Sequence, residues 1–186
     1  MTSRRLSPEE ARAERMRRLF AEAGEPLAPE DARQRGATYR ALYQDHRAPV
    51  PGARRFLAVA HARARVVVVT NNLVEEQQEK LAFLRLTPFV HDLVTSEELG
   101  VSKPDPRFFA AALERSSLDR QEVVVLGDSF ESDVVGARLS GLAVVWFNRF
   151  GARTPRTERR PPELATLRPA LRAWAAVVAA HDRALT

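Results

Sequence analysis

Short apolar runs alternate with amphipathic segments along residues 49–150, and this pattern predicts strands and helices in turn. Apolar runs at 65–69, 90–95, 123–126 and 143–147 predict strands, and helical spacing predicts helices at 53–62, 75–84, 106–115 and 133–139. The valine run of the first strand has no polar alternation, as expected for a strand covered on both faces. The alternation favours an α/β fold with a parallel sheet and right-handed crossovers.

Residues 1–48 have a helical pattern instead. Ser7, Pro8 and Glu10 form a capping-box sequence that predicts a helix start. Leu19 and Phe20 lie on the apolar face of this first helix. A second helix is expected from Pro29 towards Tyr43, with Tyr39 and Leu42 among its apolar residues. Two short helices bury little apolar surface alone, so we expect them to pack on a partner helix or on the main domain.

Residues 151–186 begin with a loop rich in proline, arginine and threonine and end in a predicted helix at 169–180. Leu171, Trp174 and Val178 have the spacing of one apolar helix face. The chain is therefore expected to comprise three parts, 1–48, 49–150 and 151–186, of which the last completes the core.

Composition narrows the function classes. The chain of 186 residues has no cysteine, which excludes disulfides, zinc–thiolate sites and thiol catalysis. No run approaches the roughly 18 apolar residues of a membrane span, and no apolar stretch follows the first arginines, so we expect a cytoplasmic protein without a membrane partner. The net charge of +5 comes from arginines interspersed with glutamates, and the one basic cluster, 153–160, lacks aromatic residues; we expect no nucleic-acid partner.

Polar residues that suit phosphate and a divalent cation follow the predicted strands. Thr70 and Asn71 come directly after the first strand, Lys103 lies in a loop before a proline, and Asp128 ends the third strand shortly before Asp133. Ligands bind at the carboxyl edge of open parallel sheets, where these residues are expected to meet. Each also has a structural interpretation: the threonine and asparagine as a helix-capping turn, the lysine as part of an ordinary loop, and the aspartates as helix caps or flanks.

These three sequence segments, around Thr70, Lys103 and Asp128, resemble the second, third and fourth motifs of the haloacid dehalogenase (HAD) superfamily. They occur in the same order and at spacings of about 30 and 25 residues. The resemblance covers residues 49–150, and residues 1–48 are similar to the last part of the family's small helical cap. The phosphatase and nucleotidase branch is the most similar. The resemblance implies a Rossmann-like parallel-sheet core and a magnesium-dependent phosphatase acting on a small phosphorylated metabolite or nucleotide.

The resemblance also implies roles for the five residues. Thr70 and Asn71 would bind the transferring phosphoryl group, and Lys103 would be the catalytic residue that neutralises charge between nucleophile and phosphate. Asp128 would bind Mg²⁺, with Asp133 ligating or steadying the metal. Magnesium and lysine together would offset the charge on the phosphoryl oxygens.

One family feature is missing. The first family strand ends in Asp-x-Asp, which supplies the nucleophile and the acid/base, but no two aspartates of this chain are one residue apart. We therefore expect a truncated, inactive or nearly inactive form with weak or absent Mg²⁺ binding. The alternative is a non-enzymatic phosphate-binding or protein-interaction module.

The missing strand belongs in the middle of the sheet, so its loss has structural consequences as well. Either the strand at 65–69 pairs directly with that at 123–126, or the chain is a fragment, or another chain fills the gap. An exposed central edge would favour a homo-oligomer. The sequence does not name the substrate.

Overall fold

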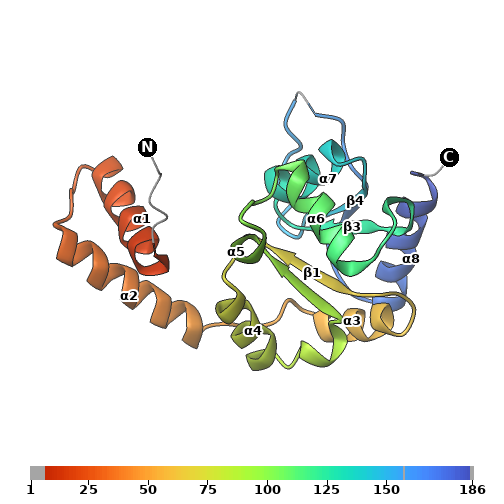
Figure 1. Cartoon of the computed structure of the whole chain (residues 1–186), viewed down its shortest axis with the longest axis horizontal. Coiled ribbons are helices and arrows are strands. Elements are labelled where there is room, and N and C mark those ends of the chain that lie inside the picture. Colours follow the sequence, from red (N-terminus) through yellow and green to blue (C-terminus); the bar gives the residue numbers. More distant parts are fainter. Residues whose placement is uncertain (1–6, 157, 185–186) are drawn as a thin grey trace. The chain divides into compact units, whose positions relative to one another are not determined.

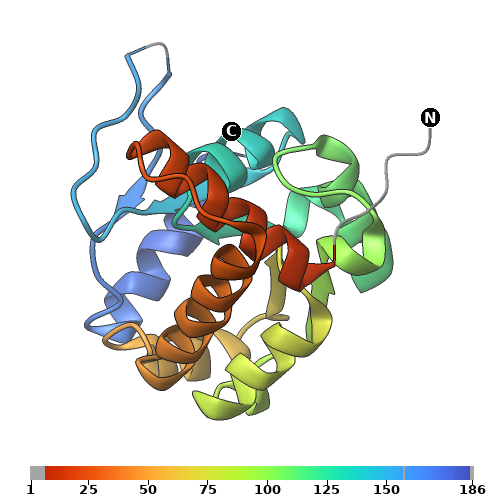
Figure 2. The same ribbon diagram turned by 90° about the vertical axis from the view of Figure 1, so that its left-hand side faces the viewer.

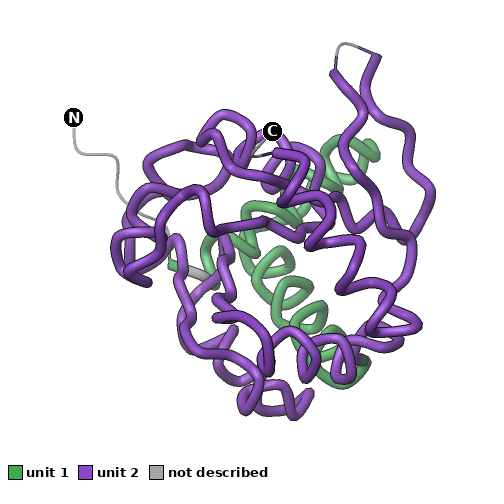
Figure 3. The backbone as a smooth tube through the Cα atoms, turned by 90° about the vertical axis from the view of Figure 1, so that its right-hand side faces the viewer, with its two compact units in different colours: residues 1–48 green, residues 49–186 purple. Residues whose placement is uncertain are grey.

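The chain forms two compact units, residues 1–48 and residues 49–186 (Figure 3). The computed structural model describes residues 7–156 and 158–184. None of the described helices is long and apolar enough to cross a membrane.

The first unit is a pair of helices, α1 (Pro8–Glu22) and α2 (Pro29–Asp45), which lie side by side (Figures 1 and 2). The predicted capping box is confirmed: the Ser7 hydroxyl accepts from the Glu10 amide at 3.2 Å, and the Ser7 amide donates to the Glu10 carboxylate at 2.7 Å. The start of α1 is therefore fixed by its local sequence.

The core of this helix pair is small. Ala13, Met16 and Ala32 are buried in it. The helices approach closely at Gly36, where an added Cβ would lie 3.4 Å from the Cβ of Arg12. Larger apolar side chains stay outside: Leu19, Tyr39, Leu42 and Tyr43 are each about half exposed. Alanines and Met16 form the centre of the contact and the predicted Phe20 packs against it, whereas the other predicted apolar side chains stay largely outside.

Parallel strands form the centre of the second unit, as predicted for an α/β fold. They are β1 (Val67–Thr70), β2 (Asp92–Thr95), β3 (Val124–Gly127), β4 (Ala143–Phe147) and the two-residue β5 (Glu163–Leu164). β1 pairs with β2, and β4 pairs with β3 on one side and β5 on the other, all in parallel.

The strands do not form one continuous sheet. Within the described residues, β1–β2 is one sheet and β3–β4–β5 is another, and no ladder joins β1 to β3. Direct pairing of these two strands, one of the three alternatives that the sequence left open, is therefore not what the chain does.

Helices follow the strands in the predicted order. They are α3 (Ala53–His61), α4 (Val74–Phe83), α5 (Ser96–Leu99), α6 (Pro106–Ser116), α7 (Gly136–Leu139) and α8 (Ala170–Asp182), with short 3₁₀ turns at Thr87–Phe89 and Arg120–Glu122. The helix predicted at 133–139 begins earlier, as a π-helical segment at Phe130–Val135. α5 and β5 were not predicted, because each is too short to show a hydrophobic period.

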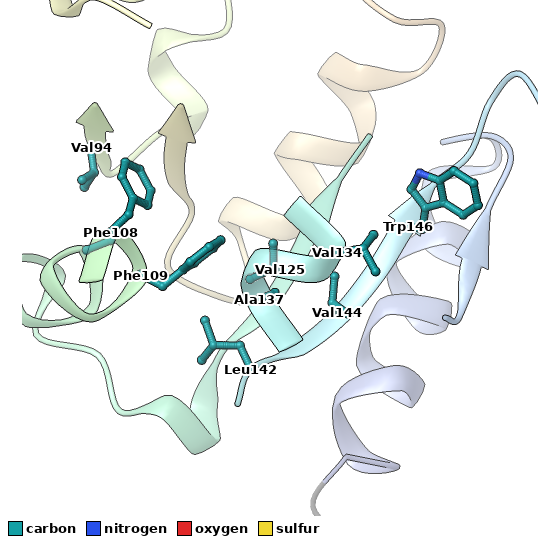
Figure 4. Packing of buried hydrophobic residues seen from close by; sticks show 10 residues of the cluster. Val94, Phe108, Phe109, Val125, Val134, Ala137, Leu142, Val144 and Trp146 are labelled. Carbon is teal, nitrogen blue, oxygen red and sulfur yellow. The ribbon is translucent and has the colours of Figure 1, made fainter. Parts of the chain in front are cut away.

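Two apolar cores lie in this unit. In the first, Phe108 and Phe109 of α6 pack with Val94 of β2, Val125 of β3 and the buried Val134 (Figure 4). The second joins α3 and α8 to the β3–β4 sheet, and Phe56, Val145 and Val177 lie in it. Val67 and Val69 of β1 pack against the first core, but all four residues of β1 are only partly buried, so the cover on both faces that the valine run predicted is incomplete.

The predicted apolar face of the last helix is only partly correct, because Trp174 packs against the second core and the other two predicted residues do not. Leu171 is 60% exposed and Val178 is 37% exposed, whereas Ala173, Val177 and Ala180 are buried. The buried face of α8 is rotated about one residue from the predicted one. Its small alanines allow α8 to lie close to β3 and β4, which favours that face over the one with larger side chains.

Candidate functional site

The carboxyl end of β1 is connected to the loop that carries Lys103. The Asn71 side chain accepts a hydrogen bond from the Lys103 amide and donates one to the Lys103 carbonyl, both at 2.8 Å. Asn71 therefore does not cap a helix, and α4 begins after Leu73 without a side-chain cap. This two-point contact fixes the backbone of Lys103 against the strand end.

The Lys103 ammonium is buried in the same place. Its Nζ donates to an Asp133 carboxylate oxygen at 2.7 Å and to the Val69 carbonyl of β1 at 3.0 Å. The side chains of Lys103 and Asp133 are only 9% and 8% exposed. Lys103 is therefore not part of an ordinary loop, because a buried ion pair requires specific partners.

Asp133 is held from both sides. Its second carboxylate oxygen accepts from the Ser129 amide at 3.0 Å. The π-helical segment brings Asp133 back over the end of β3, so close to Gly127 that a Cβ on that glycine would collide with the Asp133 side chain. Glycine at the end of β3 is thus a requirement of packing.

Asp128 has a different environment. Its side chain is exposed, and within the described part of the chain no hydrogen bond or ion pair engages its carboxylate. Its backbone carbonyl accepts from the Trp146 indole at 3.0 Å, and Ser129, not Asp128, caps the π-helical segment. The carboxylate of Asp128 is therefore available to a ligand.

The structure thus brings three of the five candidate residues into one connected cluster, Asn71, Lys103 and Asp133. Thr70 ends β1 and Asp128 follows the end of β3, but their side chains take no part in the hydrogen bonds of the cluster. All five residues lie at the carboxyl ends of β1 and β3 or are bonded to a group there.

Several groups of the cluster were not predicted. They are the Val69 carbonyl, the Ser129 amide and Gly127, whose lack of a side chain allows the close packing. Backbone groups leave no signal in residue identity, so the first two were not predictable. The glycine directly before Asp128 was a signal that a close contact occurs there.

Asp105, from the same loop as Lys103, has a structural role. It caps α6 by accepting from the Arg107 amide at 2.9 Å. Hydrogen bonds from the Arg107 side chain, and then from its amide, hold the pKa of the Asp105 carboxyl below its ordinary value. Asp105 therefore fixes the start of α6 and does not join the Lys103 cluster.

The donor set does not make a complete magnesium site. Mg²⁺ takes octahedral oxygen ligands, usually one or two carboxylates together with water and substrate phosphate. Both Asp133 oxygens are already hydrogen-bonded, and the described residues contain no group of three metal-ligating side chains. Asp128 alone offers an unengaged carboxylate, so a further ligand is needed before the metal fits.

An open pocket of about 520 Å³ lies in another part of the unit. Val74 and Leu81 of α4, Asp92 of β2 and Arg115 of α6 are among its lining residues. It shares no residue with the Lys103 cluster. The polar cluster at the strand ends, rather than this pocket, carries the candidate chemistry.

Known proteins share this order of strands, helices and polar residues. The sequence profile of the haloacid dehalogenase-like hydrolases matches residues 6–141. The chain belongs to this family. The match extends from the first unit to residue 141 of the second and includes all five candidate residues.

Individual relatives of this HAD-like chain are phosphatases. The pyrimidine 5'-nucleotidase YjjG of Escherichia coli is 39% identical over 101 residues, covering 54% of this chain and 45% of YjjG. The phosphoserine phosphatase of Thermus thermophilus is 36% identical over 148 residues, covering 77% of this chain and 58% of the relative. The chain thus spans about half the length of these relatives.

Solved structures show the same fold. YfnB of Bacillus subtilis, a HAD-hydrolase bound to magnesium, has a TM-score of 0.73 at 24% identity, covering 87% of this chain and 70% of YfnB. The L-2-haloacid dehalogenase of Xanthobacter autotrophicus has a TM-score of 0.63 at 16% identity, covering 90% and 84%. The HAD fold class predicted from the sequence is therefore confirmed.

Proposed function

We propose that this chain is the phosphate-binding core of a phosphomonoester hydrolase that acts on a small phosphorylated metabolite or nucleotide. The observation that carries the proposal is the buried Lys103 ammonium at the carboxyl ends of β1 and β3. A fixed positive charge at that edge suits a phosphoryl group whose oxygens gain charge during transfer. The phosphatase and nucleotidase relatives support the reaction class.

Within this proposal the candidate residues have different roles. Thr70 at the end of β1 donates its hydroxyl to the phosphoryl group, and Lys103 neutralises the charge on its oxygens. Asn71 positions Lys103 rather than binding phosphate, because both ends of its amide are already bonded to the Lys103 backbone. Asp133 and the Ser129 amide keep the ammonium in place.

The covalent step needs a carboxylate that these residues do not supply. Asp133 is a poor nucleophile because one oxygen is paired with Lys103 and the other accepts from Ser129. Asp31 and Asp45 lie on α2, in the other unit. We therefore expect this chain alone to hydrolyse phosphomonoesters slowly or not at all.

In this proposal, Asp128 is the residue that would bind magnesium. Its exposed carboxylate would be one ligand of the ion, the phosphoryl group would supply the further ligand that the site needs, and Asp133 would steady the surroundings through Lys103 and Ser129. Bound Mg²⁺ would offset charge on the phosphoryl oxygens. The magnesium-bound YfnB structure is a precedent within the same fold.

The test combines binding with turnover. We expect inorganic phosphate to bind the full chain in calorimetry, and Lys103→Met to weaken binding about tenfold or more. Lys80→Met, which changes the chain's other lysine on α4, serves as the matched control and should leave binding unchanged. Absence of phosphate binding to the unaltered chain would refute the proposal.

A second candidate function is a phosphate-binding or protein-interaction module without catalysis. The satisfied Lys103–Asp133 pair favours it, since neither group is left ready for chemistry. A chromogenic phosphomonoester with Mg²⁺ distinguishes the two. Turnover that Asp128→Asn and Lys103→Met both abolish supports the hydrolase, whereas phosphate binding without any turnover supports the module.

A further inference from the structure

A loop between β4 and β5 projects from the body of the second unit (Figures 1 and 3). Residues 149–160 of this loop contain five arginines and one glutamate, which give it a charge of +4 in a chain whose net charge is +5. All five arginines are exposed. The excess positive charge of the chain is therefore concentrated on one projecting segment.

Both limbs of this loop are fixed near their base. On the outgoing limb, the side chain of buried Asn148 donates to the Ala152 carbonyl and accepts from the Ala152 amide, both at 2.8 Å. On the returning limb, Arg138 of α7 donates to the Arg159 carbonyl at 2.6 Å. The loop therefore presents its charged side chains from a backbone that is held at both ends.

The nearby carboxylates are already engaged. Glu158 pairs with Arg138 at 3.3 Å, and Glu163, beyond the loop, pairs with Arg160 at 3.1 Å. Within the described part of the chain, four arginine side chains of the loop have no carboxylate partner: Arg149, Arg153, Arg156 and Arg159. Their guanidinium groups can donate to a ligand, and their mutual repulsion would be relieved by an anionic one.

One apolar side chain accompanies these charges. Phe150 is 83% exposed, the largest value among the exposed large apolar residues of the described chain. Arg149 lies over its ring, with the guanidinium carbon 4.4 Å from the ring centroid. This cation–π contact covers one face of the ring and leaves the other to a partner. Arginine beside an exposed aromatic residue is typical of the residues that dominate protein interfaces.

We propose that the loop at 149–160 binds an acidic polypeptide segment of a partner protein, in which aspartates and glutamates flank one large apolar side chain. The carboxylates would pair with the planar guanidinium forks of Arg153, Arg156 and Arg159. The apolar side chain would pack on the free face of Phe150. The loop shares no residue with the Lys103 cluster, so this proposal holds whether or not the chain hydrolyses phosphate.

The surroundings of the arginines favour a polypeptide over other polyanions. Single-stranded nucleic acid stacks successive bases on several aromatic rings, whereas Phe150 is the one aromatic residue of the loop. Anionic membranes bind amphipathic helices with a broad apolar face, and the described residues of the loop form no helix. An unstructured acidic segment can follow an irregular loop and bring several carboxylates to it at once.

The test adds the full chain to a fluorescently labelled peptide of about ten residues, in which aspartates and glutamates flank one phenylalanine, and measures anisotropy. The interface is small and charged, so we expect a dissociation constant of about 10–100 μM at about 50 mM salt. At about 300 mM salt, binding should weaken about tenfold or more, because exposed charges are screened. The matched control peptide has serine in place of phenylalanine and should bind about fivefold more weakly, because it cannot pack on Phe150.

Two double variants separate the loop from the overall charge. Arg153→Gln with Arg156→Gln should weaken peptide binding about tenfold or more, because charge-assisted hydrogen bonds are lost. Arg54→Gln with Arg55→Gln removes the same charge from exposed positions of α3 and should change binding by about twofold at most, since screening limits distant charges. All four side chains are exposed, so both variants should keep the wild-type melting temperature within a few degrees.

The proposal is wrong if the peptide does not bind at about 50 mM salt, or if the two double variants weaken its binding equally. It is also wrong if an oligouridylate of about ten nucleotides, or vesicles that contain phosphatidylserine, bind more tightly than the peptide and lose this binding in the Arg153 and Arg156 double variant. Such a result would assign the loop to nucleic acid or to a membrane surface instead.

Discussion

At the scale of single residues, the Lys103–Asp133 pair is the most consequential contact of the chain. Two opposite charges that are each less than a tenth exposed stabilise one another only while both are present. The pair also has two backbone partners at the strand ends, the Val69 carbonyl and the Ser129 amide, and the Asn71 side chain fixes the Lys103 backbone. A change in one member therefore affects stability and, under the proposed function, phosphate binding as well.

Lys103→Met should lower the free energy of unfolding by about 3 kcal/mol, because it leaves a buried carboxylate without its cation. Asp133→Asn should lower the free energy of unfolding by a similar amount, because it leaves the buried Lys103 ammonium without its carboxylate. The double variant should be less destabilised than the sum of the two, by at least about 1 kcal/mol, in urea unfolding. Additive single effects would show that the two side chains do not interact in solution.

Gly127→Ala should destabilise the chain by about 1–3 kcal/mol, because the new methyl group collides with the Asp133 side chain. The matched control is Gly36→Ala in α2, where the added Cβ makes an ordinary contact and alanine favours the helix by roughly 1 kcal/mol. Thermal unfolding of both variants gives the comparison. Equal stability of the two would contradict the close packing at the end of β3.

At the scale of elements, the junction of β2, α5 and α6 shows how side chains connect short segments. Thr95 caps α5 with a capping box to Glu98, and Glu98 also pairs with Arg115 of α6 at 2.8 Å. The hydrogen bond from Arg115, followed by those from Thr95, lowers the pKa of Glu98 below its ordinary value of 4.5. α5 is thus a helix that depends on tertiary contacts.

The lowered pKa of Glu98 predicts a pH dependence of stability. Because the folded-state pKa lies below the unfolded one, the pair stabilises the protein above about pH 4.5, and this contribution is lost as the pH falls through the folded-state pKa. Glu98→Gln, which preserves the capping box, should cost at most about 1 kcal/mol near neutral pH, since both partners are partly exposed. The difference from the wild type should shrink towards about pH 3 in urea unfolding, and a constant difference would contradict the ionic origin.

At the scale of the whole molecule, the two units differ in how much they bury. The helix pair has three buried apolar residues, Ala13, Met16 and Ala32, whereas the second unit has two larger cores. Half-exposed Tyr39 and Leu42 leave apolar surface on α2. The helix pair therefore gains less stability from its own packing than the strand-containing unit.

Hydrogen exchange should reflect this difference. Amides of α1 and α2 should exchange about tenfold or more faster than those of β3 and β4, because local opening of the helix pair exposes little core. Met16→Ala should increase exchange in both helices without affecting β4. Equal protection of helices and strands would instead show that the half-exposed apolar residues are covered in solution.

The sequence by itself determined the local elements and their type. The apolar runs predicted the strands, and their alternation with helices predicted a parallel sheet. The Ser7–Glu10 capping box predicted the start of α1, and the order of Lys103 and Asp128 indicated the family motifs. Periodicity and capping depend on neighbours a few residues away, so they can be recognised without a partner.

Only the tertiary structure decided how these elements meet. The break between β1 and β3, the Asn71 contact that fixes the Lys103 backbone and the face that α8 buries all depend on residues tens of positions apart. Backbone groups such as the Val69 carbonyl and the Ser129 amide are the same in every residue, so their use follows from geometry alone. The chain's residues specify which strands form, but the tertiary arrangement decides which of them pair.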